Sequence, residues 1–368
     1  MKIIFTIKNL SSSIGGAEKV LCKIASILVK RGHKVAIITF DSVGSSSFYQ
    51  LDSKIKRIDL AIGDSSSSAN LFESCSRIIA LREVIKREKP TVVIGFMHSI
   101  YILLAFALKG TAFPIVASEH IVIEYYKKRP FQFFLLIISS FFIKRYTVLS
   151  SSIKKKYPYC IKKKMTIIPN PIDEIKGEKL TKNECNRKIL LNIGRLEHQK
   201  DHLTLIKAFS IVANSFPEWD LIIVGEGSLK KKIKKEILSL DLNNRIFLKD
   251  FTKKIESEYI KADVFVISSI FESFGLVTAE AMSYGIPCLG FADCPGTNEL
   301  IIHGRTGLLV ESARDRSTSL AYGLNRMLLD AKLRKKLGKA AKEFINNKFS
   351  DEQVGDYWEH LLYNVIRK

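Results

Sequence analysis

The sequence predicts an α/β protein built from two doubly wound domains, each with a parallel sheet covered by helices on both faces. Short runs rich in Ile, Val and Phe alternate with longer amphipathic segments, and this alternation occurs twice along the chain. The runs are almost continuously apolar, which is typical of strands buried on both faces of a parallel sheet. At 368 residues the chain is also longer than one hydrophobic core usually supports, so we expect two domains.

The expected strands are apolar runs, and the carboxyl ends of such parallel strands are where ligands bind. In the first half the runs are Lys2–Ile7, Val35–Phe40, Val92–Phe96, Ile115–Ser118 and Tyr146–Leu149. In the second half they are Ile189–Ile193, Leu221–Val224, Ile246–Leu248, Val264–Ile267 and Pro287–Phe291. The segments with helical spacing include Ala17–Arg31, Leu71–Lys86, His202–Phe216 and Leu229–Leu240.

A linker is expected at IIPNPID, Ile167–Asp173, because prolines on both sides of Asn170 continue neither a helix nor a central strand. The predicted domains are therefore residues 1–170 and 171–349. The tail, residues 350–368, has apolar side chains at helical spacing with Ser350 as its N-cap, so it is expected to form a further helix.

The composition is that of a soluble globular protein, with 46% hydrophobic and 26% charged residues. The six cysteines are scattered without a Cys-x-x-Cys pair, so we expect neither a zinc site nor a disulfide framework, and a reducing cytosol fits best. The start, MKIIFTIKNLSSSIGG, does not have the pattern of a signal peptide. No stretch reaches the ~18–20 apolar residues that a membrane-spanning helix needs. A cytoplasmic location is expected.

Positive charge is concentrated in one segment. Residues 127–164 contain eleven Lys or Arg and no Asp or Glu, about half of the net charge of +21. Between the basic groups lies FQFFLLIISSFFI, Phe131–Ile143, too short as a helix to cross a bilayer. It is either a buried helix with solvated lysines at its ends or a face that rests on an anionic membrane. Nucleic acid is a third partner to consider, but no nucleic-acid motif accompanies the charge.

Candidate site residues of the first domain follow two of its strands. SSSIGGAEKV comes after the first strand, and Gly15 and Gly16 let backbone amides approach an anion at a helix start, unless they form a tight turn only. The stretch matches neither G-x-G-x-x-G nor the Walker pattern, which disfavours a nicotinamide dehydrogenase or a P-loop site. His120 lies just past the strand that ends at Ser118, a position that fits a structural or a catalytic histidine.

Two cations follow the first strand of the second domain. LNIGRLEHQKD places Arg195 and Lys200 on one loop, where they are either a clamp for a diphosphate or solvated surface cations. No Asp-x-Asp pair occurs in the sequence, so a bound divalent metal is not indicated. The two cations would then neutralise phosphate instead.

Two carboxylates flank a glycine turn in ESFGLVTAEAMSYG. The chain turns at Gly275 and starts a helix near Leu276, which is expected to end at Tyr284 with Gly285 as its C-cap. The start of this helix offers free N–H groups to an anion. Glu272 and Glu280 do not have the spacing of a capping box. We expect them to hold neutral hydroxyl groups attached to that anion.

Together these motifs resemble those of the retaining glycosyltransferases of family 4, which have two Rossmann-like domains in the GT-B fold. GGAE, SEH, PNPID, GRL with Lys200, and Glu272 and Glu280 in an E-x7-E arrangement occur in the order of that family. Each motif is weak alone, but five in order are a strong signal. The resemblance covers essentially the whole chain. It implies an interdomain cleft and a carboxyl-terminal helix, 350–368, that crosses back to the first domain.

The resemblance also implies roles for the candidate residues. Arg195 and Lys200 would stabilise the leaving nucleoside diphosphate. Glu272 would accept hydrogen bonds from donor-sugar hydroxyls, Glu280 would hold the ribose, and His120 would lie beside the reacting centre. The implied catalytic residues are His120, Arg195, Lys200 and Glu272. The implied donor-binding residues are Gly15, Gly16, Asp250, Phe251, Ser273, Phe274, Gly275, Leu276, Val277 and Glu280.

Two stretches depart from the usual family pattern. DCPGTNELI, Asp293–Ile301, stands where many relatives have Gly-Gly-x-x-Glu, and is similar to a Cys-Pro variant found in some transferases of surface-polysaccharide assembly. This leaves the donor sugar open. FLKDF has Asp250 where relatives often have glycine beside the base, with uracil as the expected base.

The implied activity is transfer of a hexose or N-acetylhexosamine, with retention and without a metal or other cofactor, from a UDP-sugar. The acceptor would be a polyprenyl-diphosphate-linked glycan for a bacterial O-antigen, capsule or exopolysaccharide. The basic segment adds an anionic membrane surface as a partner, which places the protein on the inner face of the cytoplasmic membrane, with no nucleic acid. One alternative is a mannosyltransferase that uses GDP-mannose. Another is a catalytically inactive protein of this fold that binds anionic membrane or nucleic acid.

Overall fold

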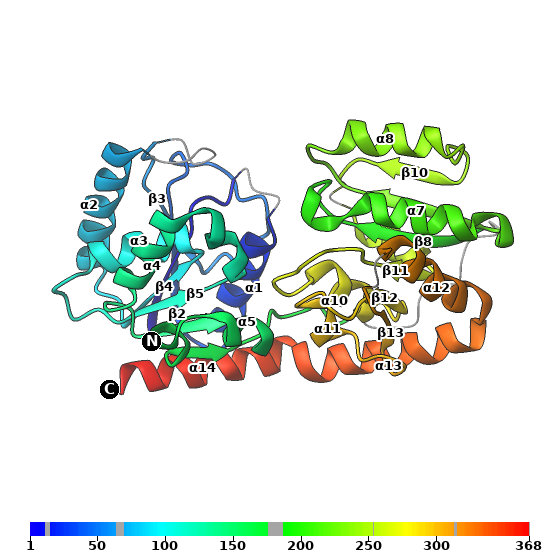
Figure 1. Cartoon of the computed structure of the whole chain (residues 1–368). Helices are drawn as coiled ribbons and strands as arrows, with labels where there is room; N and C mark the ends of the chain where they lie inside the picture. The colour runs from blue at the N-terminus through cyan, green and yellow to red at the C-terminus, as the bar shows by residue number, and fades with distance from the viewer. Residues whose placement is uncertain (12–14, 64–69, 176–186, 253, 313–314, 368) are drawn as a thin grey trace. The chain divides into compact units, whose positions relative to one another are not determined.

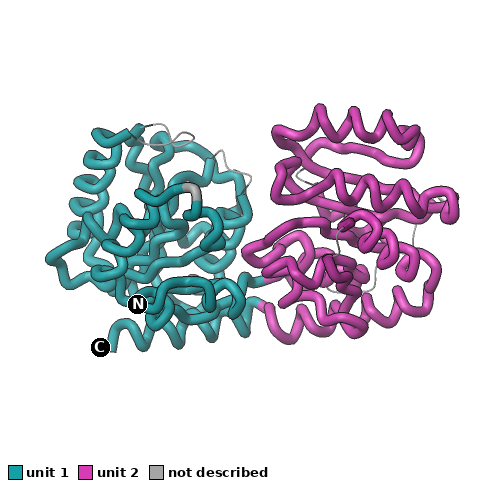
Figure 2. Tube along the Cα trace, viewed as in Figure 1, with its two compact units in different colours: residues 1–171, 351–368 teal, residues 172–350 magenta. Residues whose placement is uncertain are grey.

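The computed structural model describes residues 1–11, 15–63, 70–175, 187–252, 254–312 and 315–367. The chain divides into two compact units, residues 1–171 with 351–368 and residues 172–350 (Figure 2). Each unit contains one sheet, and every pair of neighbouring strands is parallel. The predicted fold class, α/β with two doubly wound parallel sheets, is therefore confirmed.

The sheet of the first unit has the strand order β3-β2-β1-β4-β5-β6-β7 (Figure 1). The order reverses at β1, which pairs with β2 on one side and with β4 on the other. The carboxyl ends of β1 and β4 therefore border a topological switch point, the usual position of a ligand in such a sheet. The strands are β1 (Lys2–Thr6), β2 (Lys34–Thr39), β3 (Lys56–Asp59), β4 (Val92–Phe96), β5 (Ile115–Ser118), β6 (Arg145–Val148) and β7 (Met165–Ile167).

The last helix of the chain belongs to the first unit. Helix α14 lies beside α1, where Lys23 Nζ is 3.0 Å from an oxygen of Asp351 and Arg31 Nη1 is 2.7 Å from an oxygen of Asp356. Trp358 of α14 is buried against Phe5 of β1. The helices of this unit are α1 (Gly16–Lys30), α2 (Leu71–Glu88), α3 (His98–Ala107), α4 (Pro130–Ser139), α5 (Ser151–Lys156), α6 (Tyr159–Lys162) and α14 (Asp351–Ile366), with a 3-10 helix at Ile123–Lys128.

The sheet of the second unit has the order β10-β9-β8-β11-β12-β13 and reverses at β8, which pairs with β9 and β11. Its strands are β8 (Lys188–Ile193), β9 (Trp219–Val224), β10 (Ile246–Lys249), β11 (Val264–Val266), β12 (Cys288–Phe291) and β13 (Gly307–Val310). Its helices are α7 (His202–Val212), α8 (Lys230–Ser239), α9 (Glu256–Lys261), α10 (Leu276–Ser283), α11 (Thr297–Leu300), α12 (Arg316–Leu329) and α13 (Ala331–Phe349), with 3-10 helices at His198–Lys200 and Ala213–Ser215.

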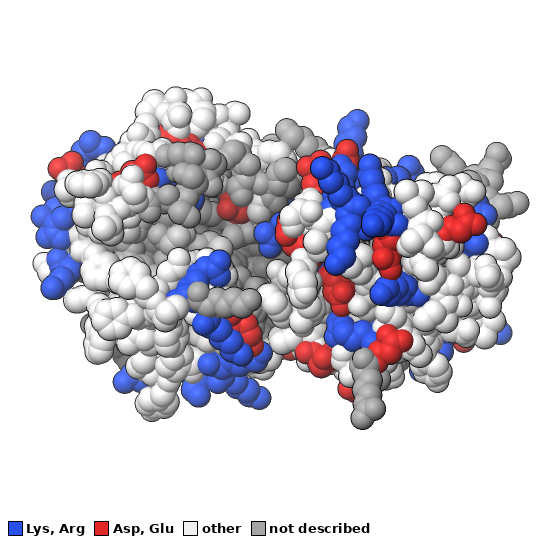
Figure 3. Space-filling model, turned by 45° about the horizontal axis from the view of Figure 1, so that its top comes forward, with Lys and Arg blue, Asp and Glu red and all other residues white. Residues whose placement is uncertain are grey.

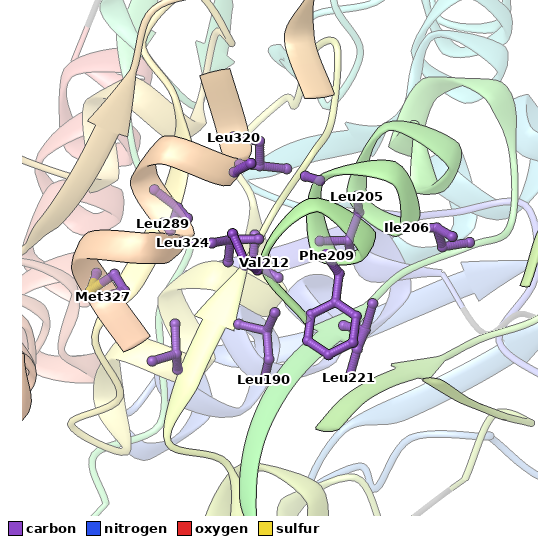
Figure 4. Packing of buried hydrophobic residues seen from close by; sticks show 14 of the residues in the cluster. Leu190, Leu205, Ile206, Phe209, Val212, Leu221, Leu289, Leu320, Leu324 and Met327 are labelled. Carbon is purple, nitrogen blue, oxygen red and sulfur yellow. The ribbon is translucent and has the colours of Figure 1, made fainter. Parts of the chain in front are cut away.

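The core of the second unit forms where α7 and α12 cover the sheet. Leu205 and Phe209 of α7 and Leu324 of α12 lie over Leu190 of β8 (Figure 4). All four side chains are fully buried. Burying a leucine or phenylalanine side chain contributes about 1.5–3 kcal/mol, so this contact fixes both helices on the strands that carry the site.

Some predicted elements differ from the structure in extent. The expected helix His202–Phe216 ends at Val212 and continues as a 3-10 helix, and the expected strand Val264–Ile267 ends at Val266. Three strands were not predicted, β3, β7 and β13. Strand β3 is KRID at a sheet edge, too polar for an apolar search, and β7 has only three residues.

The alternative of a buried helix over Phe131–Ile143 is wrong. Helix α4 ends at Ser139, and of its ten residues only Leu136 and Ser139 are buried. Phe131 and Phe134 are 66% and 57% exposed, and Phe141 beyond the helix is 76% exposed. A large apolar surface therefore faces outward in the most basic part of the sequence.

Candidate functional site

The predicted cations and one predicted carboxylate of the second unit lie at its topological switch point. The loop after β8 carries Arg195 and Lys200, and the loop after the neighbouring strand β11 carries Glu272. Lys200 Nζ donates a hydrogen bond to Glu272 Oε1 at 2.6 Å, with the two side chains only 12% and 8% exposed. The fold thus brings together two residues that are 72 positions apart in the sequence.

Further hydrogen bonds join the loop after β8 to the loop after β11. Ser269 Oγ donates to Glu272 Oε1 at 2.6 Å, and Ser268 Oγ donates to the carbonyl oxygen of Lys200 at 2.8 Å. Breaking a buried ion pair of this kind by removing one partner typically costs about 3–5 kcal/mol. The position of the Lys200 ammonium group is therefore set by the protein before any ligand binds.

Arg316 at the start of α12 is a second brace, which the sequence analysis did not predict. Its Nη2 donates to the carbonyl oxygen of Ser268 at 3.0 Å, its Nε donates to Asp201 Oδ2 at 3.3 Å, and its guanidinium lies 3.8 Å from the ring centre of Phe291. Arg316 thus joins the loop after β8 to the loop after β11. An arginine far away in the sequence gives no local signal for this role.

Arg195 differs from Lys200 because its side chain is exposed. Its guanidinium makes no hydrogen bond or ion pair with any residue that the structure describes. The loop after β9 packs against the backbone next to Arg195. A Cβ atom at Gly225 in that loop would lie 2.0 Å from the carbonyl oxygen of Gly194. The close approach of these two loops requires glycine at Gly225, and it leaves Arg195 at the edge of the site with its donors open to a ligand.

Helix α10 begins as the sequence predicted, at Leu276. Gly275 is the residue before it and has φ of 87°, a conformation that favours glycine. Within the described chain, the N–H groups of Leu276 and Val277 have no acceptor. Such groups and the helix dipole favour an anion at this end of the helix. Ser273 and the buried Phe274 lie between Glu272 and this helix start.

The Cys-Pro stretch packs directly behind Glu272. The N–H of Glu272 donates to the carbonyl oxygen of Pro295 at 3.0 Å. A Cβ atom at Gly296, whose φ is 79°, would lie 2.6 Å from the carbonyl oxygen of Glu272, so only glycine fits there. The variant DCPGTNELI therefore shapes the backbone that presents Glu272.

Glu280 is held by a tyrosine that the sequence analysis missed. The hydroxyl of Tyr259, on α9, donates to Glu280 Oε2 at 2.8 Å, and its ring stacks on Tyr284 with centroids 5.2 Å apart. Burial, together with the nearby charge of Glu280, raises the pKa of Tyr259 well above its ordinary value. Tyr259 therefore keeps its proton and donates it to this carboxylate, with the carbonyl oxygen of Val277 as a second, longer acceptor at 3.2 Å.

Asp250 and Phe251 lie at the carboxyl end of the edge strand β10. Both are exposed, and Asp250 forms an ion pair with Lys230 at the start of α8. The N–H of Gly225 donates to the carbonyl oxygen of Lys249 at 3.0 Å. The two residues thus share the loop-bearing edge of the sheet with Arg195 and Glu272, two strands away from the switch point.

In the first unit, Gly15 and Gly16 form the start of α1. Gly15 is the N-cap, in an extended conformation, and Gly16 is the first residue of the helix. Residues 12–14 of the predicted glycine–serine loop lie outside the described residues. The loop is anchored before them by Asp41, whose carboxylate accepts hydrogen bonds from the N–H of Leu10 and the hydroxyl of Ser11, both at 2.7 Å.

His120 follows β5, next to β4 and the switch point of the first unit. Its Nε2 lies 3.0 Å from Ser118 Oγ, and its ring stacks on Phe96 with centroids 4.9 Å apart. Burial lowers the pKa of His120 to about 4. The imidazole is therefore neutral near pH 7, which excludes a role as a permanent cation.

The residue beside it, Glu119, was not singled out from the sequence. It is 1% exposed and accepts hydrogen bonds from Tyr101 at 2.5 Å, from Tyr126 at 3.1 Å and from the N–H of Ile121 at 3.0 Å. Burial raises its pKa, and these hydrogen bonds oppose that shift. Glu119 thus fixes the backbone on both sides of His120. Its sequence signals were the SEH motif and its position directly after a buried strand.

Metal sites and membrane-spanning helices are two further features to consider. Among the described residues, no group of three or more His, Cys, Asp or Glu side chains could hold a metal ion. No helix in that part of the chain is long and apolar enough to cross a membrane.

The sequence matches two family models and several proteins of known activity. The model for glycosyltransferase family 4 matches residues 14–175, and the model for glycosyl transferases group 1 matches residues 174–344. The enzyme GalNAc-α-(1→4)-GalNAc-α-(1→3)-diNAcBac-PP-undecaprenol α-1,4-N-acetyl-D-galactosaminyltransferase of Campylobacter jejuni is 30% identical over 373 residues, which cover 99% of each chain. The amylovoran biosynthesis glycosyltransferase AmsD of Erwinia amylovora is 24% identical over 381 residues, 98% of this chain and 99% of AmsD.

Solved structures share the fold over the whole chain. The sucrose-phosphate synthase of Thermosynechococcus elongatus superposes with a TM-score of 0.83 at 17% identity and covers 100% of this chain and 99% of its own. The Anabaena protein HepE in complex with UDP and glucose superposes with a TM-score of 0.78 at 18% identity, covering 99% of this chain and 100% of HepE.

Proposed function

Because this chain belongs to glycosyltransferase family 4 and has the GT-B fold, we propose that it is a retaining, metal-independent transferase of bacterial surface-glycan assembly. It moves a hexose or N-acetylhexosamine from a UDP-sugar to a polyprenyl-diphosphate-linked glycan. The named activity of the Campylobacter relative, on an undecaprenol-diphosphate glycan, supports the acceptor class. The amylovoran enzyme supports the polysaccharide context.

One observation carries the proposal: at the switch point of the second unit, Lys200 of the loop after β8 pairs with Glu272 of the loop after β11, with Arg195 exposed on the first loop and the start of α10 just after Glu272. In the reaction the bond between sugar C1 and the diphosphate breaks, a bond from C1 to the acceptor oxygen forms, and the acceptor proton leaves with the diphosphate. Negative charge therefore develops on the diphosphate. Two cations and free helix N–H groups stabilise that charge, while Glu272 accepts hydrogen bonds from the sugar and Glu280 from the ribose.

The direct test is a donor screen. The purified protein is incubated with a panel of nucleotide sugars and a membrane lipid extract, diphosphate release is measured, and NMR reads the anomeric configuration of the product. We expect one UDP-sugar to react with retention, and Arg195→Ala to lower the rate by about 10²–10³. Near-normal activity of Arg195→Ala would remove that residue from the mechanism, and an inverted product would contradict retention.

The alternative donor, GDP-mannose, uses the same groups with a different base pocket. Calorimetric titration with UDP and with GDP separates the two, and we expect UDP to bind more tightly. Failure to bind any nucleoside diphosphate would favour the inactive protein of the same fold instead. The buried Lys200–Glu272 pair favours an active enzyme over an inactive protein of this fold. A buried ion pair adds little net stability, so stability alone does not explain why it is present.

We also propose that the aromatic surface of α4 rests on anionic lipid, which brings the enzyme to a lipid-linked acceptor. The surface consists of the exposed Phe131, Phe134 and Phe141. Basic groups adjoin it, since Lys109 Nζ lies over the Phe142 ring at 5.7 Å and Lys164 Nζ donates to the carbonyl oxygen of Ser140 at 2.6 Å. On the face drawn in Figure 3, Lys and Arg form several separate groups rather than one continuous surface. An aromatic face beside lysines is the pattern of interfacial binding.

Vesicle sedimentation tests this surface. The triple variant Phe131→Ser, Phe134→Ser, Phe141→Ser is expected to lose at least ~10-fold in binding to phosphatidylglycerol vesicles, because each aromatic ring adds apolar area to the contact. The matched control is Leu71→Ser, Phe72→Ser, Ile79→Ser, which removes an equally exposed apolar face from α2 of the same unit. Equal binding by the two triple variants would contradict the lipid contact.

A further inference from the structure

A short hydrogen-bond relay ends on His120. Thr147 Oγ1, on β6, donates to Ser118 Oγ, on β5, at 3.0 Å, and Ser118 Oγ lies 3.0 Å from His120 Nε2. Thr147 and Ser118 are each 1% exposed, so water does not compete for these bonds. The relay crosses two neighbouring strands and is set by their pairing, in which Ser118 is opposite Thr147.

The relay determines which ring nitrogen of His120 carries the proton. A serine hydroxyl has one proton to donate, and Ser118 already accepts the proton of Thr147. Among the described residues, Nε2 is the acceptor left for the Ser118 proton. If Nε2 carried a proton itself, the buried Ser118 proton would have no acceptor, which is unfavourable. Nε2 therefore accepts, and Nδ1 carries the ring proton.

Packing holds the ring in this orientation. Phe96 stacks on one face of His120, and Trp358 of α14 stacks on Phe96 with centroids 6.4 Å apart and planes 14° apart. The low pKa of His120, about 4, agrees with a neutral ring. Nδ1 has no hydrogen-bond partner among the residues that the structure describes, so this donor is available to a ligand.

We propose that Ser118 and Thr147 are positioning residues that fix His120 as the Nδ1–H tautomer, so that His120 donates a hydrogen bond to the transferred sugar and is neither a general base nor a cation. This step rests on the proposed function, because it assigns His120 a task in sugar transfer. A neutral donor suits that task. It binds a sugar oxygen without placing positive charge beside the positive charge that develops on the sugar ring.

The tautomer is tested without any activity measurement. Long-range ¹H–¹⁵N correlation spectra of histidine-labelled protein distinguish Nδ1–H from Nε2–H rings, and His120→Asn identifies the signal by its loss. We expect the Nδ1–H form at every pH from 5 to 8. An Nε2–H ring, or protonation with a midpoint near the ordinary histidine value of about 6.5, would overturn the proposal.

Three substitutions test the relay itself. Thr147→Val keeps the shape and removes the hydroxyl, Thr147→Ser keeps the hydroxyl, and Ser118→Ala removes the link to the ring. We expect Thr147→Val and Ser118→Ala to give mixed tautomers and a kcat lowered about 10-fold, with KM for the donor unchanged and Thr147→Ser close to the unmodified protein. The matched control is Thr166→Val, which makes the same change opposite Thr147 on β7. An unchanged tautomer in Ser118→Ala would contradict the relay.

The position of the donor is tested by two replacements of His120. Asparagine places an amide N–H near the position of Nδ1, whereas glutamine places its amide near Nε2. We expect His120→Asn to retain at least ~10 times the kcat of His120→Gln. The reverse order would contradict donation from Nδ1. If the unmodified protein transfers no sugar from any donor, the proposed function fails, while the spectra still decide the tautomer.

Discussion

The two units hold the loops at or beside their switch points in different ways. In the second unit the loops after β8 and β11 are held by charge, through the Lys200–Glu272 ion pair and the guanidinium of Arg316. In the first unit the residues after β5 are held by hydroxyls and aromatic rings around His120, and by the buried carboxyl group of Glu119. Similar sheets therefore present an ion pair at the site of one unit and a neutral histidine in the other.

On the proposed function, this difference matches two parts of a nucleotide sugar, the diphosphate and the transferred sugar. The diphosphate carries negative charge before and after transfer, so cations in fixed positions stabilise it throughout. The sugar gains positive charge only as the bond breaks, so a neutral donor beside it avoids repulsion. The comparison predicts the largest loss when a charged side chain of the second unit is removed. Smaller losses are expected when the side chain removed only positions another group by a hydrogen bond.

The largest effect is expected for Lys200→Ala, which removes a cation from the leaving diphosphate and leaves Glu272 buried without its ion-pair partner. The rate of sugar transfer should fall by about 10²–10³. Steady-state kinetics measures this loss, and Lys207→Ala, an exposed lysine on α7, is the matched control. If Lys200→Ala were as active as the Lys207→Ala control, charge at the site of the second unit would not be important for transfer.

A moderate effect is expected on stability as the pH falls. His202 is buried without a hydrogen-bond partner for either ring nitrogen among the described residues, and burial lowers its pKa to about 4. Between pH 6.5 and 4 the unfolded chain therefore binds a proton that the folded protein does not, so stability is full above pH 6.5 and falls as the pH drops. The loss at pH 5 is on the order of 1–2 kcal/mol. Thermal unfolding at pH 7 and pH 5 measures it.

The variant His202→Leu removes this titration and is expected to weaken the dependence of Tm on pH over the same range. His303→Leu, at a less buried site of the same unit, is the control. An identical pH dependence in the unmodified protein and in His202→Leu would show that His202 is not buried as a neutral group.

The smallest effect is expected for Tyr259→Phe, which removes the hydrogen bond to Glu280 and keeps the ring stacked on Tyr284. KM for the donor should rise about 5-fold, equal to about 1 kcal/mol, with little change in kcat, because on the proposed function Tyr259 only orients Glu280, which would hold the ribose away from the reacting atoms. Tyr322→Phe, on an exposed part of α12, is the control. A loss in kcat instead of KM would show that Glu280 has a different task.

Local patterns in the sequence predicted most strands and the start of the helix at the candidate site. Apolar runs gave most strands within one or two residues, and Gly275 with its flanking pattern gave the start of α10. Polar or very short edge strands such as β3 and β7 carry no such pattern. For α4 the sequence left two alternatives open, a buried helix and an outward apolar face, because an apolar run does not reveal what covers it.

Residues that support the site were harder to predict because their partners are distant in the chain. Arg316 and Tyr259 act on loops many positions away, and nothing near them in the sequence marks that contact. Ser118 and Glu119 were within a recognised motif, yet only the pairing of β5 with β6 shows that Ser118 meets Thr147. Motifs therefore identify candidate site residues, and the fold identifies the groups that hold them in place.

Hydrogen exchange of the backbone with and without nucleotide tests the central claim, that the charged site of the second unit binds the nucleoside diphosphate. The full chain is labelled alone, with UDP and with GDP, and peptides are read by mass spectrometry. We predict that UDP protects residues 194–200 and 272–280 and leaves residues 115–121 unchanged. Protection confined to residues 115–121, or no protection by either nucleotide, would contradict the account.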